Sequence, residues 1–369
     1  APCVDRGRLL QAPKQDRCRR RGRSAPRLLE AAGRNAERDR PLRGDRPRGQ
    51  DHAAVHGVAA IAGKPPKNVP ASVFERLRNL ARERGEDVNA LLAQYAVERL
   101  LYRISRSAQA DRFVLKGAML FRAWTGSLHR PTQDVDLLGY GDPEPDRLAE
   151  TFAAILREVT DESDGLVFDD AAVTAEEIRG AQEYGGVRVC VPATLGTARV
   201  VVQIDVGFGD AITPEATERE FPPLLGHEAP RIRAYPPETA VAEKVEAICS
   251  IGIANSRMKD YYDLIAISRR FDFDGRTLAQ AIAATFERRG TPIPTEQPVG
   301  LSDRFAEDEH KRTQWGAFLK RTKQLDAPSD LSEVLRLVRQ FVEPPLGAAG
   351  APAAFAARWL PGQDSQEAE

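Results

Sequence analysis

Two aspartates separated by one valine lie in the segment RPTQDVDLLGYGDP, residues 130–143. The apolar residues that follow predict a β-strand, and side chains two positions apart on a strand point to the same face. Asp134 and Asp136 therefore share one face, and Val135 points to the other. Because two like charges at such close range repel each other, a cation is expected between them. Mg²⁺ is the usual choice, since it binds one or two carboxylates together with phosphate oxygens.

A third acid, Asp205, lies between the β-branched residues Ile204 and Val206 in another predicted strand. If that strand is a neighbour of the first one, its carboxylate joins the same face. Three carboxylates on one sheet can hold two metal ions for in-line phosphoryl transfer, and one of them can accept a proton from an attacking hydroxyl. Alternating acids on a strand are also typical of the solvated face of a half-buried sheet, so a purely structural interpretation stays open.

Two further segments carry groups that could bind phosphate. Lys116 and Gly117 end a predicted strand just before a helix, where free backbone N–H groups can meet a phosphate. Glycine is common in any such turn, so this signal is weak alone. Lys244 lies among alanine and valine on a predicted helix that is otherwise apolar on that side.

The next predicted helix opens with a cluster of charges that includes Arg257. Lys259 and Asp263 are four residues apart and could pair on the helix surface, and Asp260 lies on nearly the same face as Asp263. This set is equally typical of a helix with an acidic first turn and ordinary surface ion pairs.

The composition is that of a folded protein with two domains, or with one elaborated domain and appendages. The chain has 369 residues, of which 42% are hydrophobic and 29% are charged, and this length exceeds that of one ordinary domain. It contains no apolar run of about 18 residues, as a transmembrane helix would need, and no apolar stretch of a secretory signal. The four cysteines are scattered without C-x-x-C spacing, which argues against a disulfide framework or a zinc site and favours the cytoplasm.

Charge is distributed unevenly along the chain. Residues 1–50 contain 15 lysines or arginines against 6 acidic residues, whereas the net charge of the whole chain is −1. The chain beyond them is therefore acidic. A basic arm could contact nucleic acid, but the lack of apolar periodicity and the abundance of Arg, Pro and Gly predict disorder over residues 1–64.

The order of the predicted elements indicates the fold class. Helical spacing predicts a helical hairpin over about 71–105, and alternation predicts strands around 113–115 and 134–140 and a β-hairpin that turns at 195–197. Beyond residue 209 the pattern is helical. We therefore expect an α+β protein, a small mixed β-sheet core flanked by helices with a helical C-terminal region. The expected divisions are a disordered Arg-rich arm (1–64), an N-terminal helical hairpin (65–106), the α/β core (107–215), a helical C-terminal domain (216–345) and a loose tail (346–369).

Five segments, in this order along the chain, resemble the AbiEii/AbiGii toxin family of nucleotidyltransferases, which includes the MenT-type toxins. They are FVLKGAMLF, RPTQDVDLL, VQIDVGFGD, ETAVAEKVEAI and NSRMKDYYDL. The resemblance spans residues 70–340 and rests on the full set, because each segment alone is unspecific. It implies a DNA polymerase β-like nucleotidyltransferase core over 107–215 and a helical C-terminal region.

The resemblance also implies an activity and partners. The family transfers a nucleotide from a nucleoside triphosphate with Mg²⁺ or Mn²⁺, and MenT-type members place it on the 3′ acceptor end of tRNA. AbiEii members are toxins of type IV toxin–antitoxin and phage-defence systems. The neighbouring antitoxin gene usually encodes a winged-helix repressor, often without a stable toxin–antitoxin complex. We therefore expect an enzyme that attaches a nucleoside monophosphate to an acceptor hydroxyl, with tRNA as the acceptor.

Five positions match the motifs of the family one by one. Asp134 and Asp136 match its metal-binding pair, and Thr132 matches a Ser/Thr that is autophosphorylated in some members. Lys244 matches the lysine expected to meet the triphosphate. Asp260 matches the later acid of the site, which gives it a catalytic role by resemblance.

The remaining candidates come from the residues themselves. Asp205 is the expected third metal ligand and catalytic carboxylate, and Asp263 is close enough to Asp260 to take its role. The wider superfamily begins its site with Gly-Ser, whereas Ala118 follows the glycine here, so phosphate contact would depend on backbone N–H groups and nearby cations. The expected nucleotide-binding residues are Lys116, Gly117, Arg130, Thr132, Lys244 and Arg257.

Three other interpretations remain. A glycosyltransferase also uses D-x-D to hold a metal and a nucleotide diphosphate, but a Rossmann-like half should then precede it, and only a strand and a helix are predicted there. A binding protein that kept the fold without activity should have lost an acid or Lys244, and none is lost. A nucleotidyltransferase can also act on a small molecule or a protein, and the acidic chain beyond residue 50 is unusual for RNA binding.

Overall fold

A mixed sheet of eight strands lies at the centre of the computed structural model, which describes residues 68–132, 134–178, 185–323, 326–361 and 367–368. The Arg-rich arm predicted over residues 1–64 lies outside the described residues. The strands are β1 (Phe113–Lys116), β2 (Asp134–Gly139), β3 (Leu166–Phe168), β4 (Thr174–Ile178), β5 (Gly186–Leu195), β6 (Ala198–Phe208), β7 (Thr217–Glu220) and β8 (Arg231–Ala234). Their order is β3–β5–β6–β2–β1–β8–β7, with β4 also paired to β5.

The middle of the sheet combines parallel and antiparallel pairs. β2 pairs in parallel with β6 and antiparallel with β1, and β5 pairs antiparallel with β6. β5 and β6 form the predicted hairpin, in which Gly196 takes a left-handed φ of 61° at the turn. The predicted fold class, an α+β protein with a mixed sheet flanked by helices, is confirmed.

Two strands lie in the range for which only helices were predicted. β8 pairs in parallel with β1, and β7 pairs with β8 at the sheet edge. All four residues of β7, with the sequence TERE, are exposed, so the apolar alternation that indicates a strand is missing. The sheet therefore continues beyond residue 215, and the second neighbour of β1 comes from a distant part of the chain.

One face of the sheet is covered by helices. They are α2 (Val88–Arg106), which packs against β6, and α4 (Pro145–Glu158), which packs against β4 and β5. On β2 the residues that face this layer, Val135 and Leu137, are buried, and Phe152 of α4 contacts Phe113 of β1 with ring centroids 5.2 Å apart. Burial of an apolar side chain of this size stabilises the fold by about 1.5–3 kcal/mol. The opposite face is mixed, because it carries Asp134 and Asp136 but also the buried Leu138 of β2.

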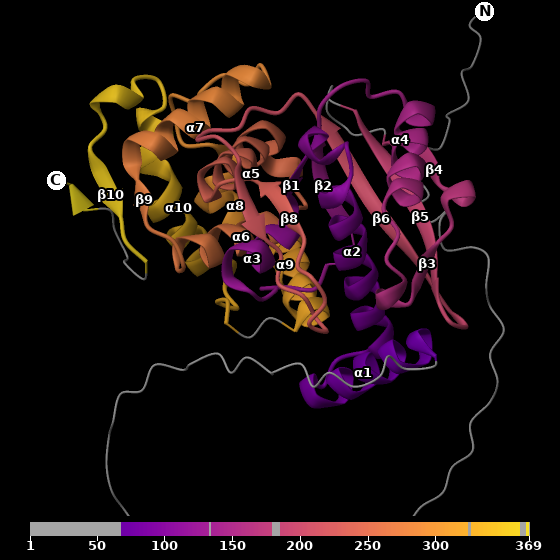
Figure 1. The fold of residues 1–369 in the computed structure, drawn as a ribbon. Coiled ribbons are helices and arrows are strands. Elements are labelled where there is room, and N and C mark those ends of the chain that lie inside the picture. Colours follow the sequence, from indigo (N-terminus) through magenta and orange to yellow (C-terminus); the bar gives the residue numbers. More distant parts are fainter. Residues whose placement is uncertain (1–67, 133, 179–184, 324–325, 362–366, 369) are drawn as a thin grey trace, which may run out of the picture. The chain divides into compact units, whose positions relative to one another are not determined.

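The helical hairpin predicted over about 71–105 is formed by α1 (Val69–Arg84) and α2. Asn68 begins α1 by accepting a hydrogen bond from the backbone N–H of Ala71, and Gly85 ends it in the left-handed region. These ends fix where the chain turns back, and α2 then crosses the sheet (Figure 1).

Six described helices follow β8 and gather beside β1 and β8, where Figure 1 draws them in orange and yellow. They are α5 (Pro237–Ile251), α6 (Met258–Ser268), α7 (Gly275–Arg288), α8 (Asp303–Glu307), α9 (Glu309–Thr322) and α10 (Leu331–Ala348); the short α3 (Leu120–Thr125) precedes β2. None of the described helices is long and apolar enough to span a membrane. Asn68–Glu369 forms one compact unit, and the boundaries predicted within it stay predictions.

The tail that was expected to be loose over 346–369 contains regular structure where it is described. A small second sheet consists of β9 (Phe273–Asp274), β10 (Ala357–Trp359) and β11 (Glu367–Ala368). Trp359 is buried with its ring 4.9 Å from that of Phe341, and its Nε1 donates to the carbonyl of Ser268 at 2.8 Å. One aromatic anchor thus orders a segment whose Ala, Gly and Pro content predicted the opposite.

A buried charge network attaches α2 to the segment before β3. Asp164 is fully buried, and its Oδ2 accepts hydrogen bonds from Arg99 Nε at 3.3 Å and Arg103 Nη1 at 2.7 Å. Its Oδ1 accepts from the backbone N–H of Leu166 at 2.9 Å. Both arginines are themselves buried, and Arg103 depends on this carboxylate, whereas Arg99 also pairs with Asp161 at 3.1 Å.

Asp164→Ala should lower the free energy of unfolding by about 3–5 kcal/mol, because it leaves the buried guanidinium group of Arg103 without its counter-charge and removes one partner of Arg99. Chemical denaturation measures this loss. The control is Asp142→Ala, which removes an exposed ion pair with Arg147 at 3.4 Å and should cost less than about 1 kcal/mol. Equal losses in the two variants would contradict the assigned role of the network.

Candidate active site

Four charged side chains form one row across the sheet. Lys116 of β1 is the register partner of Asp136 of β2, Asp136 is that of Asp205 of β6, and Asp205 is that of Arg188 of β5. Register partners point to the same face of a sheet, so all four lie opposite the buried layer. The expectation that Asp205 lies next to Asp136 is confirmed. A cation ends the row on each side.

The negative charges of the Asp134 and Asp136 carboxylates are not neutralised by a direct partner among the described residues. No donor of the described residues forms a hydrogen bond to either carboxylate. Burial raises the pKa of both, and Asp205 raises it further, while Lys259 and then Lys116 oppose the rise at Asp136. Such carboxylates are the kind that a bound cation would stabilise. Their position and chemistry therefore fit one divalent cation shared with phosphate oxygens.

The carboxylate of Asp205 differs from those of Asp134 and Asp136 because it already has an ion-pair partner, Arg188. Arg188 donates from Nε and Nη2 to the two carboxylate oxygens of Asp205, both at 2.8 Å. Across the described residues, no three His, Cys, Asp or Glu side chains are grouped so as to hold a metal ion. The metal and base roles of Asp205 stay predictions, and either role requires that its pair with Arg188 opens.

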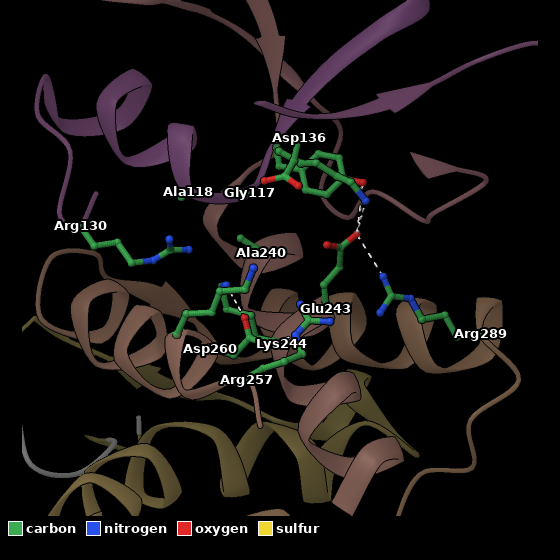
Figure 2. A pocket seen from close by; sticks show the side chains of 13 residues that line it. Gly117, Ala118, Arg130, Asp136, Ala240, Glu243, Lys244, Arg257, Asp260 and Arg289 are labelled. Atoms are coloured by element: carbon green, nitrogen blue, oxygen red, sulfur yellow. Dashed lines mark hydrogen bonds and ion pairs between the residues drawn. The ribbon is translucent and has the colours of Figure 1, made fainter. Parts of the chain in front are cut away.

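A cavity of about 200 Å³ lies beneath Asp136 (Figure 2). Its lining contains six cationic and three acidic side chains, together with small residues such as Ala118 and Ala240. Figure 2 shows Arg130, Lys244 and Arg289 approaching the space from different sides. The cations are Lys116, Arg130, Lys244, Arg257, Lys259 and Arg289, and the acids are Asp136, Glu243 and Asp260. This excess of positive charge in a concave site favours an anionic ligand.

Asp263 organises one wall of the cavity from below. It is buried on α6 and accepts from Arg130 Nε and Nη2 at 2.7 and 3.0 Å and from Lys244 Nζ at 2.7 Å. Burial would raise its pKa, but Lys244 and Arg130 hold the pKa well below the usual value. Asp263 therefore positions two cations that line the cavity and does not line it itself. The expected surface pair between Lys259 and Asp263 is wrong, because Asp263 points into the protein and Lys259 is exposed.

Asp260 takes the position facing the cavity. Its Oδ1 accepts from Lys244 Nζ at 3.2 Å, and its Oδ2 forms an ion pair with Arg257 Nε at 2.6 Å. Of the two acids that the sequence left in competition, Asp260 lines the cavity and Asp263 lies behind it. Figure 2 shows Asp260 beside Lys244 and Arg257.

The opposite wall is held by a second set of carboxylates. Lys116 Nζ lies 2.7 Å from Asp210 and 3.6 Å from Glu243, and Arg289 pairs with Asp210 at 3.1 Å and with Glu246 at 2.7 Å. Burial would raise the pKa of Asp210, but Lys116 and Arg289 lower it to about 2. The expected nucleotide-binding Lys116 thus lines the cavity in a fixed position.

Comparison with known proteins identifies the family. A family model for the nucleotidyl transferase AbiEii toxin of type IV toxin–antitoxin systems matches residues 99–337. The chain belongs to this family. It is therefore a nucleotidyltransferase toxin that uses a nucleoside triphosphate and has an antitoxin as partner, and the glycosyltransferase and inactive-binder interpretations are set aside.

Two solved structures are similar to this chain over most of its length. The nucleotidyltransferase toxin MenT4 of Mycobacterium tuberculosis H37Rv is 19% identical with a TM-score of 0.42, over 76% of this chain and 98% of that chain. JHP933 of Helicobacter pylori is 12% identical with a TM-score of 0.42, over 72% of this chain and 98% of that chain. No curated protein matches the chain.

Thr132 lies apart from the cavity of this AbiEii-family chain. It is half-buried, and its hydroxyl donates to the backbone carbonyl of Asp134 at 3.4 Å. It is absent from the residues that line the cavity. Its expected role in nucleotide binding stays a prediction.

His129 is a residue of the site that the sequence did not indicate. Its ring lies between those of Phe121, at a centroid distance of 3.4 Å, and Tyr262, at 5.6 Å. Its Nε2 is 2.6 Å from Asp263 Oδ1. Burial lowers the pKa of His129 although Asp263 opposes this, so a neutral imidazole donates to Asp263. No local pattern predicts the contacts with Asp263 and Tyr262, because these residues lie 134 and 133 positions away in the sequence.

Gly117 in the turn after β1 is required by two constraints. Its φ of 72° lies in the left-handed region, and a Cβ atom there would lie 2.6 Å from Asp136 Cγ and closer still to Oδ2. Gly117→Ala should therefore displace the Asp136 carboxylate, remove most nucleotide transfer and lower the free energy of unfolding by about 2–4 kcal/mol. Activity and denaturation measurements test both effects.

The matched control for that substitution is Gly126→Ala. Gly126 also has a left-handed φ, of 83°, but a Cβ atom there has no neighbour within 4 Å. It should lose only about 1–2 kcal/mol from backbone strain and keep its activity. Equal loss of activity in both variants would show that the crowding against Asp136 is irrelevant.

Asp136→Asn should make the metal-free protein more stable at neutral pH. A carboxyl whose folded pKa is raised opposes folding above that pKa, and this cost disappears as the pH falls below the unfolded value. The difference in unfolding free energy between variant and wild type should therefore shrink on acidification. Thermal denaturation with EDTA and with Mg²⁺ or Mn²⁺ measures it.

The same thermal denaturation measurements also test whether Asp136 binds a metal ion. Mg²⁺ or Mn²⁺ should raise the melting temperature of the wild type and have little effect on Asp136→Asn. A variant that is less stable than wild type in EDTA, or that gains as much from the metal, would contradict this assignment.

Proposed function

We propose that this chain transfers a nucleoside monophosphate from a nucleoside triphosphate to an acceptor hydroxyl with the help of Mg²⁺ or Mn²⁺. The observation that supports this is that Asp136 lines a cavity together with six cations, while Asp134 lies two residues before it on the same face of β2. Asp134 and Asp136 would hold the cation. When bound, it would supply polarisation of the phosphate oxygens.

The residues around the cavity bind and orient the triphosphate in this proposal. Lys244 and Arg130, fixed by Asp263, bind the β- and γ-phosphates, and Arg257, paired with Asp260, binds beside them. These groups stay in place when charge moves onto the leaving pyrophosphate, which is the electrostatic preorganisation that phosphoryl transfer needs.

In the transfer step one bond to the α-phosphorus replaces another. The acceptor oxygen forms a bond to the α-phosphorus while the bond between the α-phosphorus and the oxygen that bridges to the β-phosphate breaks. Pyrophosphate leaves into the cavity, and the hydroxyl proton passes to Asp205 if its pair with Arg188 opens, or to water.

The finer assignments rest on the family. The 3′ end of tRNA as acceptor, a winged-helix repressor as antitoxin, a role in phage defence and a cytoplasmic location are proposals supported by the resemblance to MenT-type and AbiEii toxins. One observation favours a small-molecule or protein acceptor instead, namely that the chain beyond residue 50 has more acidic than basic residues.

Incubation of the protein with each α-labelled nucleoside triphosphate, Mg²⁺ and total cellular RNA should place label on RNA of tRNA size. RNA whose 3′ diol has been oxidised with periodate should accept none. Asp136→Ala should lower transfer on the order of a hundredfold or more, because a metal ligand is lost, whereas Asp142→Ala should transfer normally.

Each other outcome has a distinct meaning. Label on a small molecule or on protein would replace tRNA with the alternative acceptor. Unchanged transfer by Asp136→Ala would contradict the metal site, and absence of transfer to RNA, protein and lysate metabolites alike would contradict the proposed function.

A further inference from the structure

Five of the six cations that line the cavity already have a carboxylate partner. The pairs are Lys116 with Asp210 at 2.7 Å, Arg130 with Asp263 at 2.7 Å, Lys244 with Asp263 at 2.7 Å, Arg257 with Asp260 at 2.6 Å and Arg289 with Glu246 at 2.7 Å. Lys259 is the exception, because no acceptor of the described residues lies within hydrogen-bond or ion-pair distance of its ammonium group.

The position of Lys259 joins the cavity to the carboxylate pair. It is the second residue of α6, directly before Asp260, and its exposed side chain lines the cavity. Among the charges that act on the Asp136 carboxylate, that of Lys259 has the largest effect. Its ammonium group therefore lies between the cavity and the Asp136 carboxylate of the charge row.

An unpaired ammonium is the cation that gains most from a phosphate. A paired cation shares its charge with the carboxylate that holds it, so a ligand adds less to its stabilisation. Lys259 has no such bond to share, and its flexible stem can follow the ligand. The described residues of the cavity offer Lys259 no acceptor, and a phosphate oxygen of a ligand would supply one.

We propose that Lys259 binds the phosphate oxygens of the triphosphate that lie next to Asp136. This inference rests on the proposed nucleotide chemistry of the same cavity. It also gives Lys259 two effects of opposite sign. Its charge repels a divalent cation that binds Asp134 and Asp136 alone, and it attracts the triphosphate, so it favours loading of metal and nucleotide together.

The test uses the full chain and two binding probes, inorganic tripolyphosphate and Mn²⁺ alone, both measured by titration calorimetry. Lys259→Gln should bind tripolyphosphate about tenfold or more weakly, since one charge-assisted bond is lost. It should bind Mn²⁺ at least as tightly as the wild type. Lys259→Arg should keep most of the tripolyphosphate affinity, because the charge remains.

The matched control is Lys320→Gln on α9, an exposed lysine that does not line the cavity. It should change neither affinity, and its binding corrects for the general effect of removing one positive charge. Wild-type affinity of Lys259→Gln for tripolyphosphate would overturn the inference. So would weaker Mn²⁺ binding by that variant, because it would mean that Lys259 only supports the Asp136 carboxylate.

Label transfer from the nucleoside triphosphate separates this inference from the proposed function. If the wild type transfers nucleotide and Lys259→Gln does so with unchanged kcat/KM, the inference fails and the function stands. If the wild type transfers to no acceptor but tripolyphosphate binding depends on Lys259, the function fails and the anion site stands.

Discussion

The carboxylate of Asp263 is the interaction on which the geometry of the cavity depends. It is buried on α6, and it accepts hydrogen bonds from His129 and Arg130 in the loop before β2 and from Lys244 on α5. Removal of one partner from a buried ion cluster of this kind leaves an uncompensated charge, which costs several kcal/mol. The loop, α5 and α6 therefore hold one another in place across 133 residues of sequence. The aromatic rings around His129 limit the access of water and so strengthen these bonds.

Two parts of the site handle charge in opposite ways. Around the cavity, all lining cations except Lys259 are neutralised within the described residues, so the wall is stable without a ligand. At Asp134 and Asp136 the carboxylates lack such partners within the described residues, and the raised pKa of Asp136 means that its ionised form opposes folding. Proteins keep unfavourable groups of this sort mainly where activity needs them. The contrast separates the paired cations, which stabilise the wall of the cavity, from the unpaired carboxylates, which a bound cation would stabilise.

Local periodicity was enough to predict that the three aspartates share one face of the sheet, but not which cation pairs with Asp205. Alternation along two strands placed Asp134, Asp136 and Asp205 on one face, and the register of β2 and β6 agrees. Arg188 could have been found by counting outward through the hairpin, from Leu195 opposite Ala198 to Arg188 opposite Asp205. The predicted turn at 195–197 was one residue too long to give that register.

Other features could not be predicted from local sequence patterns. The charges of α6 suggested a surface pair, and only tertiary packing shows that Asp263 turns inward and Lys259 outward. The short strands β7 and β8 carry no alternation strong enough to be recognised, because β7 is exposed throughout and β8 has only four residues. A single buried Trp359 orders the tail in spite of its composition.

The pairing of β8 with β1 has a consequence for the time at which the site is completed during synthesis. The strand that holds Asp134 and Asp136 leaves the ribosome long before β8, and α5 with Lys244 follows β8 directly. A growing or truncated chain that stops short of α5 has acids but not the lysine and α6 groups that surround the cavity. In such a fragment the carboxylates of the sheet are present without most of the cations that line the cavity, so the lining is complete only once the chain has been made as far as Arg289.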